Sequence, residues 1–201
     1  STLAFESDDF FESATLGSQW TIVDPLGDST SSITGVGTGD ALLELSVAGG
    51  TGHDLWRDEK NAPRAMQNAQ DSDFEAEVKF ESQPSQKYQL QGLLVEQDAS
   101  NWIRFDTYHN GSELVIFAGA TTNGSSRSKI SEVIPSDAAS YLRVNRQGEV
   151  WQFEYSGDGS NWATAGSFSQ SLTVNQIGPF AGNVGPNPAF TAKVDYFFNN
   201  A

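Results

Sequence analysis

The chain has 201 residues and a formal net charge of −15 from 11 Lys and Arg against 26 Asp and Glu. So acidic a surface repels phosphate, which excludes nucleic acid as a partner. There is no cysteine, so disulfides and thiolate metal sites are excluded, and no apolar run approaches the roughly 20 residues of a membrane span. The length suits one domain over residues 1–201. Because the sequence opens at Ser1, we expect a mature or excised module of a larger secreted, bacterial protein.

Short alternating or apolar runs recur along the chain between Gly, Asn, Asp, Ser and Pro, and helical periodicity is nearly absent. This pattern is typical of an antiparallel sandwich. In chain order, the predicted strands are Ala41–Val47, Asp73–Glu81, Tyr88–Glu96, Trp102–Tyr108, Leu114–Ala118, Tyr141–Arg146, Val150–Tyr155, Gly178–Asn183 and Ala189–Phe197. Two Gly- and Ser-rich segments, Asp24–Asp40 and Asn123–Ser128, are predicted to be surface loops.

Several of these strands have one apolar and one polar face. Asp73–Glu81 alternates Phe, Ala, Val and Phe with Glu and Lys, and Tyr141–Arg146 and Val150–Tyr155 behave in the same way. Antiparallel sheets show this alternation when one face packs on the core. The sequence therefore predicts an all-β fold in which two antiparallel sheets form a sandwich.

The strand Trp102–Tyr108 carries the most informative alternation. Its core-facing set is Ile103, Phe105 and Thr107, because successive side chains of a strand point to opposite faces. The opposite set consists of two aromatic rings, a guanidinium and a carboxylate, from Trp102, Arg104, Asp106 and Tyr108. Aromatic rings stack on apolar C–H patches, and charged planar groups make directed hydrogen bonds to hydroxyls. This exposed row is suited to a polyhydroxylated ligand.

Several motifs follow one another in a familiar order. They are Asp8-Asp-Phe10, Gln19-Trp20, His53-Asp-Leu-Trp56, Asn61-Ala-Pro-Arg64, Asp73-Phe74-Glu75, Gln91-Gly-Leu-Leu-Val95, Asp98-Ala-Ser-Asn-Trp102, Asp158-Gly-Ser-Asn-Trp162 and Val194-Asp195-Tyr-Phe197. In this order the chain resembles a concanavalin A-like lectin/glucanase sandwich. It is particularly similar to the non-catalytic C-terminal domains of β-xylosidase-type glycoside hydrolases and to related domains of unassigned function.

The resemblance implies a jelly-roll sandwich whose concave sheet often binds sugar. We therefore expect a non-catalytic carbohydrate-binding module that holds a polysaccharide or oligosaccharide on this face. The expected binding residues are Gln91, Trp102, Arg104, Asp106 and Tyr108 on the sheet and Trp56, Arg57 and Arg64 at the rim. Two arginines in the cleft would suit an anionic or densely hydroxylated glycan.

The resemblance also implies a structural calcium ion, which many members carry on the convex side near the termini. Calcium takes six to eight oxygen ligands from carboxylates, amides, carbonyls and water. Glu6, Asp8 and Asp195 are the candidate ligands, since the first and last strands of such sandwiches usually pair.

Two alternatives remain open. The first is a glycan-degrading hydrolase or lyase on the same face. Glu75, Glu77 and Glu81 share one face of their strand, but Glu77 and Glu81 stand about 13 Å apart, more than the roughly 5–9.5 Å that glycoside hydrolysis needs. The second alternative is a structural or adhesive protein-binding domain, which would be favoured if Arg104 formed salt bridges with Glu75 or Glu77 and left no open cleft.

Overall fold

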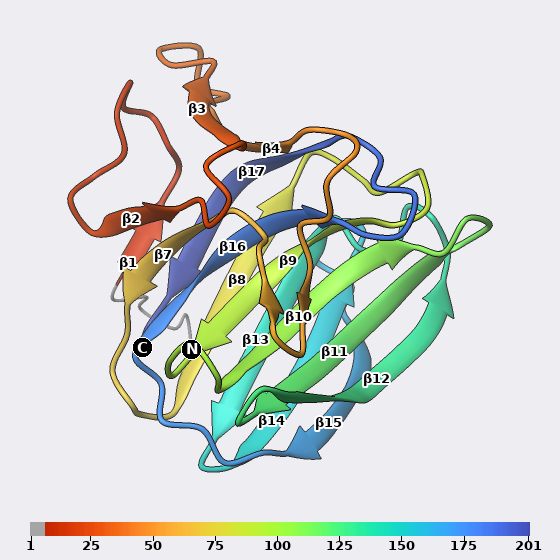
Figure 1. Ribbon diagram of the computed structural model, residues 1–201. Coiled ribbons are helices and arrows are strands. Elements are labelled where there is room, and N and C mark those ends of the chain that lie inside the picture. Colours follow the sequence, from red (N-terminus) through yellow and green to blue (C-terminus); the bar gives the residue numbers. More distant parts are fainter. Residues whose placement is uncertain (1–6) are drawn as a thin grey trace.

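Two antiparallel β-sheets packed face to face make up the protein in a computed structural model that describes residues 7–201 (Figure 1). Within this range there is no helix, and hence none that could cross a membrane. The predicted all-β, two-sheet jelly-roll sandwich is confirmed.

Sheet A has eight strands and sheet B has seven. In spatial order, sheet A contains β15 (Ala163–Ser169), β14 (Val150–Ser156), β13 (Tyr141–Gln147), β8 (Phe74–Phe80), β17 (Phe190–Asn199), β4 (Leu42–Val47) and β3 (Thr30–Thr34), and β1 (Ser7–Asp9) also pairs with β17. Sheet B contains β12 (Ser125–Ile134), β11 (Leu114–Thr122), β10 (Trp102–His109), β9 (Gln89–Glu96), β16 (Gln176–Asn183), β7 (Arg64–Asn68) and β2 (Trp20–Val23). A small hairpin of β5 (Leu55–Trp56) and β6 (Glu59–Lys60) belongs to neither sheet.

All nine strands predicted from the sequence are present. Among the strands that the sequence did not predict are β3 and β15 at the edges of sheet A and β2 and β12 at the edges of sheet B. The predicted loops Asp24–Asp40 and Asn123–Ser128 were wrong in part, because they contain β3 and the beginning of β12. Edge strands are partly solvated on both faces, so they lack the alternation that identifies a half-buried strand.

The core between the sheets is built from the inward sets of both. Phe105 of β10 contacts Trp151 and Phe153 of β14, with ring centroids 6.0 Å and 5.3 Å apart. Ile103, Phe105, Trp151 and Phe153 are all completely buried. The predicted inward faces of β10 and β14 are thereby confirmed, and the other face of β10 must point away from sheet A.

Two hairpins, one in each sheet, turn through the same five-residue sequence pattern, Asp-x-Ser-Asn-Trp. In the β9–β10 turn, Asp98 Oδ1 accepts from the backbone N–H groups of Ser100 (2.8 Å) and Asn101 (2.9 Å). In the β14–β15 turn, Asp158 Oδ1 accepts from Ser160 and Asn161 at 2.8 Å each. These hydrogen bonds to backbone N–H groups hold the pKa of Asp158 well below its usual range. Each turn is therefore fixed by its own aspartate.

We expect Asp158→Ala to lower the melting temperature at neutral pH, because the turn loses its acceptor for two backbone N–H groups. Since folding depresses the pKa of Asp158, its contribution is present above the unfolded pKa and is lost as pH falls through the folded value. Melting curves of the variant and wild type at neutral and strongly acidic pH would check this. Equal melting temperatures at neutral pH would contradict it.

Candidate functional site

The face of sheet B that points away from the core carries the row predicted from the sequence. The register of β10 with β9 pairs Arg104 with Leu94 and Tyr108 with Leu90, so all four lie on this outer face. However, the row is not exposed as predicted: Trp102 and Asp106 have no exposed surface and Arg104 is 4% exposed. Only Tyr108 is half-buried.

A segment between β4 and β7 buries the row. This covering segment, residues 53–63, includes the β5–β6 hairpin and passes in front of sheet B (Figure 1). Leu55 and Ala62 from the segment pack with Trp102, Leu94 and Phe180 in a second hydrophobic cluster outside the main core. Trp102 therefore serves as an anchor for the covering segment and offers no open ring to a ligand.

His53 fixes the start of the covering segment. Its Nδ1 lies 2.9 Å from Asn183 Oδ1 and 3.0 Å from the carbonyl of Thr51, and its Nε2 lies 2.8 Å from Asp28 Oδ1. Burial by itself lowers the pKa of His53, but the hydrogen bonds to Asp28 and Asn183 outweigh it and raise the pKa. One imidazole thus connects the start of the covering segment to Asp28 and to the end of β16.

Arg104 is the centre of the site. Its Nε and Nη2 donate to Asp106 Oδ1 and Oδ2, each at 2.8 Å, in a bidentate pair. Its Nη1 donates to Asp54 Oδ1 and to the carbonyl of Leu55, each at 3.0 Å. Four of the five N–H groups of this guanidinium are therefore used. Burial opposes the charge on Arg104, but Asp106 and Asp54 outweigh burial and raise its pKa, so the guanidinium stays charged.

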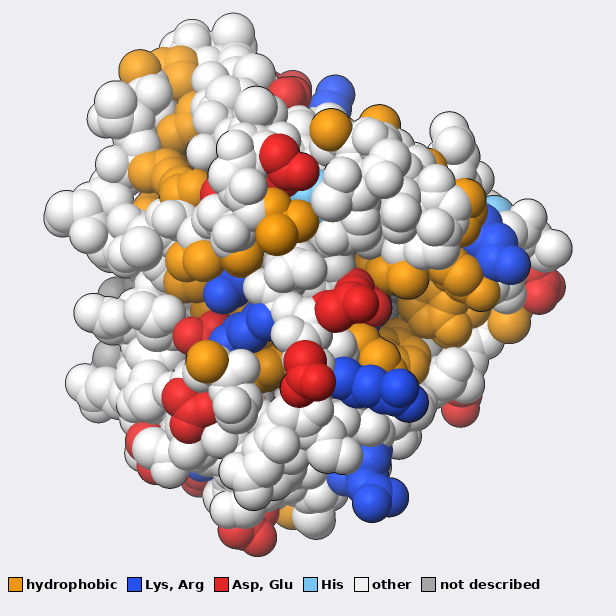
Figure 2. Space-filling model, viewed as in Figure 1, with side chains coloured by type: hydrophobic (Ala, Val, Ile, Leu, Met, Phe, Trp, Pro, Cys, Tyr) orange, Lys and Arg blue, Asp and Glu red, His pale blue; other side chains and the backbone are white. Residues whose placement is uncertain are grey.

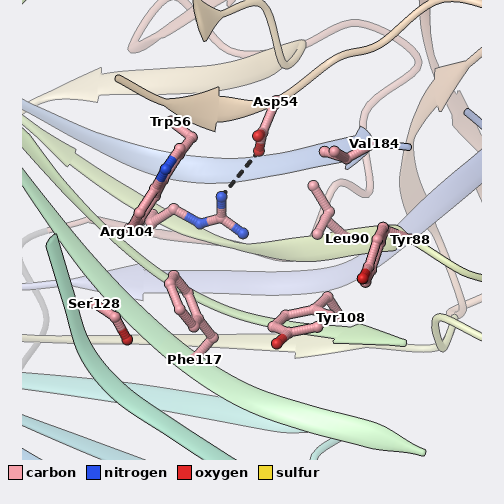
Figure 3. A pocket seen from close by; sticks show the side chains of 9 residues that line it. All are labelled: Asp54, Trp56, Tyr88, Leu90, Arg104, Tyr108, Phe117, Ser128 and Val184. Carbon is pink, nitrogen blue, oxygen red and sulfur yellow. Dashed lines mark hydrogen bonds and ion pairs between the residues drawn. The ribbon is translucent and has the colours of Figure 1, made fainter. Parts of the chain in front are cut away.

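An open cavity of about 290 Å³ lies over this ion pair. This aromatic pocket is lined by Asp54, Trp56, Tyr88, Leu90, Arg104, Tyr108, Phe117, Ser128 and Val184 (Figure 3). In the space-filling view, apolar side chains gather on the sheet B side of the molecule with charged side chains bordering them (Figure 2). The pocket combines an apolar wall with a charged floor.

Four rings follow one another along the wall of the aromatic pocket. The ring centroids of Trp56 and Phe117 are 5.9 Å apart, those of Phe117 and Tyr108 are 5.8 Å apart, and those of Tyr108 and Tyr88 are 5.9 Å apart. Gly119 leaves the space for Trp56, because a Cβ at this position would lie 2.9 Å from the Trp56 ring. The position of Trp56 therefore depends on a glycine opposite Arg104 in the sheet.

Polar groups without a hydrogen bond to the described residues surround the same cavity. The hydroxyls of Tyr88, Tyr108 and Ser128 make no hydrogen bond within residues 7–201, and neither does Asp54 Oδ2. The rings can stack on C–H groups of a ligand, and the hydroxyls and the carboxylate oxygen beside them can pair with ligand hydroxyls.

The structure brings together only some of the residues predicted for the site. Trp56, Arg104 and Tyr108 line the pocket, and Asp106 lies beneath it. The other members, Gln91, Trp102, Arg57 and Arg64, are not among the lining residues. The sequence did not single out Tyr88, Phe117, Leu90, Ser128 or Val184, although the alternation of Leu114–Ala118 already placed Phe117 opposite the core-facing residues.

Gln91 is placed on the other face of sheet B. The register pairs it with Thr107, which belongs to the core-facing set, so it lies one residue out of step with Arg104. Its Nε2 donates to the Ser82 carbonyl at 2.8 Å, and its Oε1 accepts from the Ser82 hydroxyl at 2.6 Å. The expected place of Gln91 beside Arg104 was wrong for this reason.

The two rim arginines differ in environment. Arg57 is exposed in the turn of the β5–β6 hairpin, and its backbone N–H donates to Ser126 Oγ at 2.6 Å. Arg64 is buried at the start of β7, where its Nη1 donates to the Ala62 carbonyl at 3.0 Å and its Nε lies 3.9 Å from Glu96 Oε2. Arg64 supports the covering segment from below.

The predicted calcium ligands are described only in part. Glu6 lies outside residues 7–201, and the side chain of Asp8 is not described. The backbones of β1 and β17 pair as expected, with Asp8 opposite Phe198. Asp195 Oδ2 lies 2.6 Å from Lys79 Nζ, a cation partner that does not fit a calcium ligand. Among the described residues no group of three or more metal-binding side chains gathers, and calcium stays a prediction.

The carboxylates considered for hydrolysis lie on a different sheet. Glu75 and Glu77 belong to β8 of sheet A, where Glu77 accepts from the Tyr196 hydroxyl at 2.6 Å and from Arg143 Nε at 3.4 Å. The salt bridge from Arg104 to Glu75 or Glu77 that would have favoured a protein-binding domain is not formed, since Arg104 pairs with Asp54 and Asp106. Burial raises the pKa of Glu75. Neither glutamate is near the aromatic pocket, whose lining comes from sheet B and its loops.

Residues 43–193 match the family described as "Protein of unknown function (DUF1349)". The chain belongs to this family. No curated protein matches it significantly. The chain has the architecture that the sequence resemblance implied, a concanavalin A-like sandwich similar in fold to part of GH43 structures.

Three solved structures illustrate the fold. The GH43 protein BlXynB from Bacillus licheniformis is 19% identical over 100% of this chain and 40% of its own, with a TM-score of 0.78. A functionally unknown protein from Saccharomyces cerevisiae is 19% identical, with a TM-score of 0.65 over 90% of this chain and 94% of its own. The CBM2 module of Lactobacillus casei BL23 phage J-1 evolved Dit is 6% identical, with a TM-score of 0.63 over 97% and 95%. This chain spans about two fifths of the GH43 structures.

We expect Arg104→Ala to destabilise the fold, because it leaves the Asp106 carboxylate buried without its partner. The cost of breaking such a pair is about 3–5 kcal/mol. Chemical denaturation of Arg104→Ala, Asp106→Ala and the double variant would measure this cost. The double variant should lose less free energy of unfolding than the two single variants summed. A loss below about 1 kcal/mol in Arg104→Ala would contradict the role of the pair.

A second prediction concerns the pH dependence of stability through His53. Because folding raises its pKa, the ion pair with Asp28 stabilises the protein below the unfolded value of about 6.5, and this contribution is lost as pH rises through the folded value. The difference in melting temperature between wild type and His53→Gln should therefore shrink on going from acidic to alkaline pH. Asp28→Asn, which keeps an acceptor and removes the charge, should show a weaker pH dependence than wild type. A constant difference across the range would exclude a protonated His53.

Proposed function

We propose that the protein is a non-catalytic carbohydrate-binding module of a secreted protein and that it holds a glycan in the aromatic pocket. The observation that carries this proposal is the pairing of four consecutive rings with unused hydroxyls around one cavity. Protein interfaces spread their hydrogen bonds over a wide area, at about one per 100–200 Å², whereas these groups surround one small cavity.

The size of the cavity supports a small ligand. Its volume of about 290 Å³ is at the lower end of the roughly 300–1,000 Å³ typical of ligand pockets. A sugar ring placed there would stack its C–H face on Trp56, Phe117 or Tyr108. Its hydroxyls would meet Tyr88, Asp54 Oδ2 and the remaining N–H of Arg104. Longer glycans would extend beyond the open side of the pocket.

The same geometry argues against glycoside hydrolysis in this pocket. Hydrolysis needs one carboxyl group to protonate the leaving oxygen and a second carboxylate on the other side of the bond. Asp106 is completely buried, with both of its oxygens on Arg104, and Asp54 shares the same guanidinium. Asp106 does not line the pocket, so Asp54 is the one carboxyl among the lining residues and the required pair is not formed.

The setting of the module is part of the proposal. The GH43 structures show that a sandwich of this fold occurs within longer chains. A module that retains glycan would keep an attached enzyme or adhesin near polysaccharide, and its acidic surface would keep it soluble outside the cell.

We expect Trp56→Ala and Tyr108→Ala each to weaken glycan binding by at least about tenfold, since each removes a stacking surface from the pocket. A glycan array followed by calorimetry on the retained oligosaccharide would measure this. Trp162→Ala is the matched control, because Trp162 is a half-buried aromatic at the β14–β15 turn of sheet A.

Two results would overturn the proposal. Release of reducing ends or unsaturated products during long incubation would identify an enzyme. Absence of binding to neutral, anionic and amino glycans by a folded protein, with and without calcium, would favour a protein-binding domain. Equal binding by wild type and both pocket variants would instead move the glycan to another surface.

A further inference from the structure

We propose that Asp54 makes the aromatic pocket selective for uncharged sugars and that its free oxygen, Oδ2, accepts a hydrogen bond from a sugar hydroxyl. This inference rests on the proposed function, because it names the class of glycan held at the same site. It also narrows the expectation of an anionic or densely hydroxylated glycan, which rested on two arginines in the cleft, to the uncharged class.

The charges at the floor of the pocket carry the argument. Arg104 is the one cation among the lining residues, and it is paired with both Asp106 and Asp54. Two carboxylates against one guanidinium leave a net charge of −1 at the site. The guanidinium is 4% exposed and has one N–H left, so it cannot form a bidentate pair with a ligand carboxylate. A uronic acid or sulfate would face an uncompensated negative charge.

The other cations nearby do not reverse this balance. Arg64 is buried below the covering segment, close to Glu96. Arg57 is exposed and does not line the pocket, and Lys87 is exposed too, with its Nζ 5.0 Å from the ring centroid of Tyr88. Solvent and salt screen both charges from a ligand inside. With a chain charge of −15, the long-range field has the same sign as the site.

Asp54 is the residue through which this selectivity can be changed. Its Oδ1 accepts from Arg104 Nη1 at 3.0 Å and from the Leu55 N–H at 2.8 Å, whereas Oδ2 has no hydrogen bond to the described residues. Asp54 lines the pocket beside Arg104 (Figure 3). Asp54→Asn keeps an oxygen for Arg104 and removes the negative charge. Asp106 cannot serve this purpose, because both of its oxygens hold the guanidinium.

The test uses matched pairs of oligosaccharides that differ only in charge. Cellohexaose, a galactose hexamer and every oligosaccharide retained on the array are each compared with a form whose primary hydroxyls are oxidised to carboxylates. Calorimetry at low and high salt is performed on wild type, Asp54→Asn and Asp58→Asn. Asp58 is an exposed residue of the β5–β6 turn that does not line the pocket, so Asp58→Asn changes the net charge equally.

We expect wild type to prefer the neutral partner by at least about tenfold at low salt, and Asp54→Asn to reduce this preference by about fivefold or more. Asp58→Asn should stay within about twofold of wild type, because its charge is screened. Wild-type affinity for the oxidised partner equal to or above that for the neutral one would overturn the inference and leave the proposed function standing. An unchanged preference in Asp54→Asn would overturn the role of Asp54. If no oligosaccharide of any pair bound to the protein, the proposed function itself would be rejected.

Discussion

The buried ion pair between Arg104 and Asp106 is the interaction on which the rest of the site depends. Two charges without contact to water are tolerable only if their hydrogen bonds are nearly all satisfied. That requirement brings Asp54 and the Leu55 carbonyl down onto the guanidinium. The covering segment is thereby held against sheet B, and the ring of Trp56 takes its place in the pocket wall. The need to satisfy the buried guanidinium of Arg104 therefore determines where the covering segment lies and, through it, the shape of the pocket.

The site consists of a buried layer that holds the covering segment in place and an upper layer that lines the cavity. The buried layer is formed by Trp102 and Asp106, which have no exposed surface, and by Arg104, which is 4% exposed at the floor of the pocket, and it holds the covering segment. The upper layer consists of the rings and hydroxyls around the cavity, which a ligand can reach. This separation explains why the most distinctive polar residues of β10 are poor candidates for direct contact. Asp106 and all but one N–H of Arg104 already bond within the protein, so most of the contact area falls to the neighbouring rings and hydroxyls.

The sequence was sufficient for the fold and for one row of the site. The alternation of apolar and polar residues located β10 and the face on which Arg104 and Tyr108 lie, because successive side chains of a strand point to opposite faces. It could not show that residues 53–63 return across that row, since this depends on contacts distant in sequence. Nor could it fix the register of β9, where a shift of one residue moved Gln91 to the opposite face. The edge strands, such as β12, were missed because water reaches both of their faces.

The repeated Asp-x-Ser-Asn-Trp turn has a consequence for how the protein folds. In each turn the aspartate accepts hydrogen bonds from backbone N–H groups of the same turn. β9 therefore pairs with β10, and β14 with β15, across loops of only a few residues. Closing such short loops costs little chain entropy compared with pairing β1 to β17 at opposite ends of the sequence. Both sheets thus possess a local starting point. We therefore expect the pairing of β1 with β17 to form late and to complete sheet A, because it closes the longest loop.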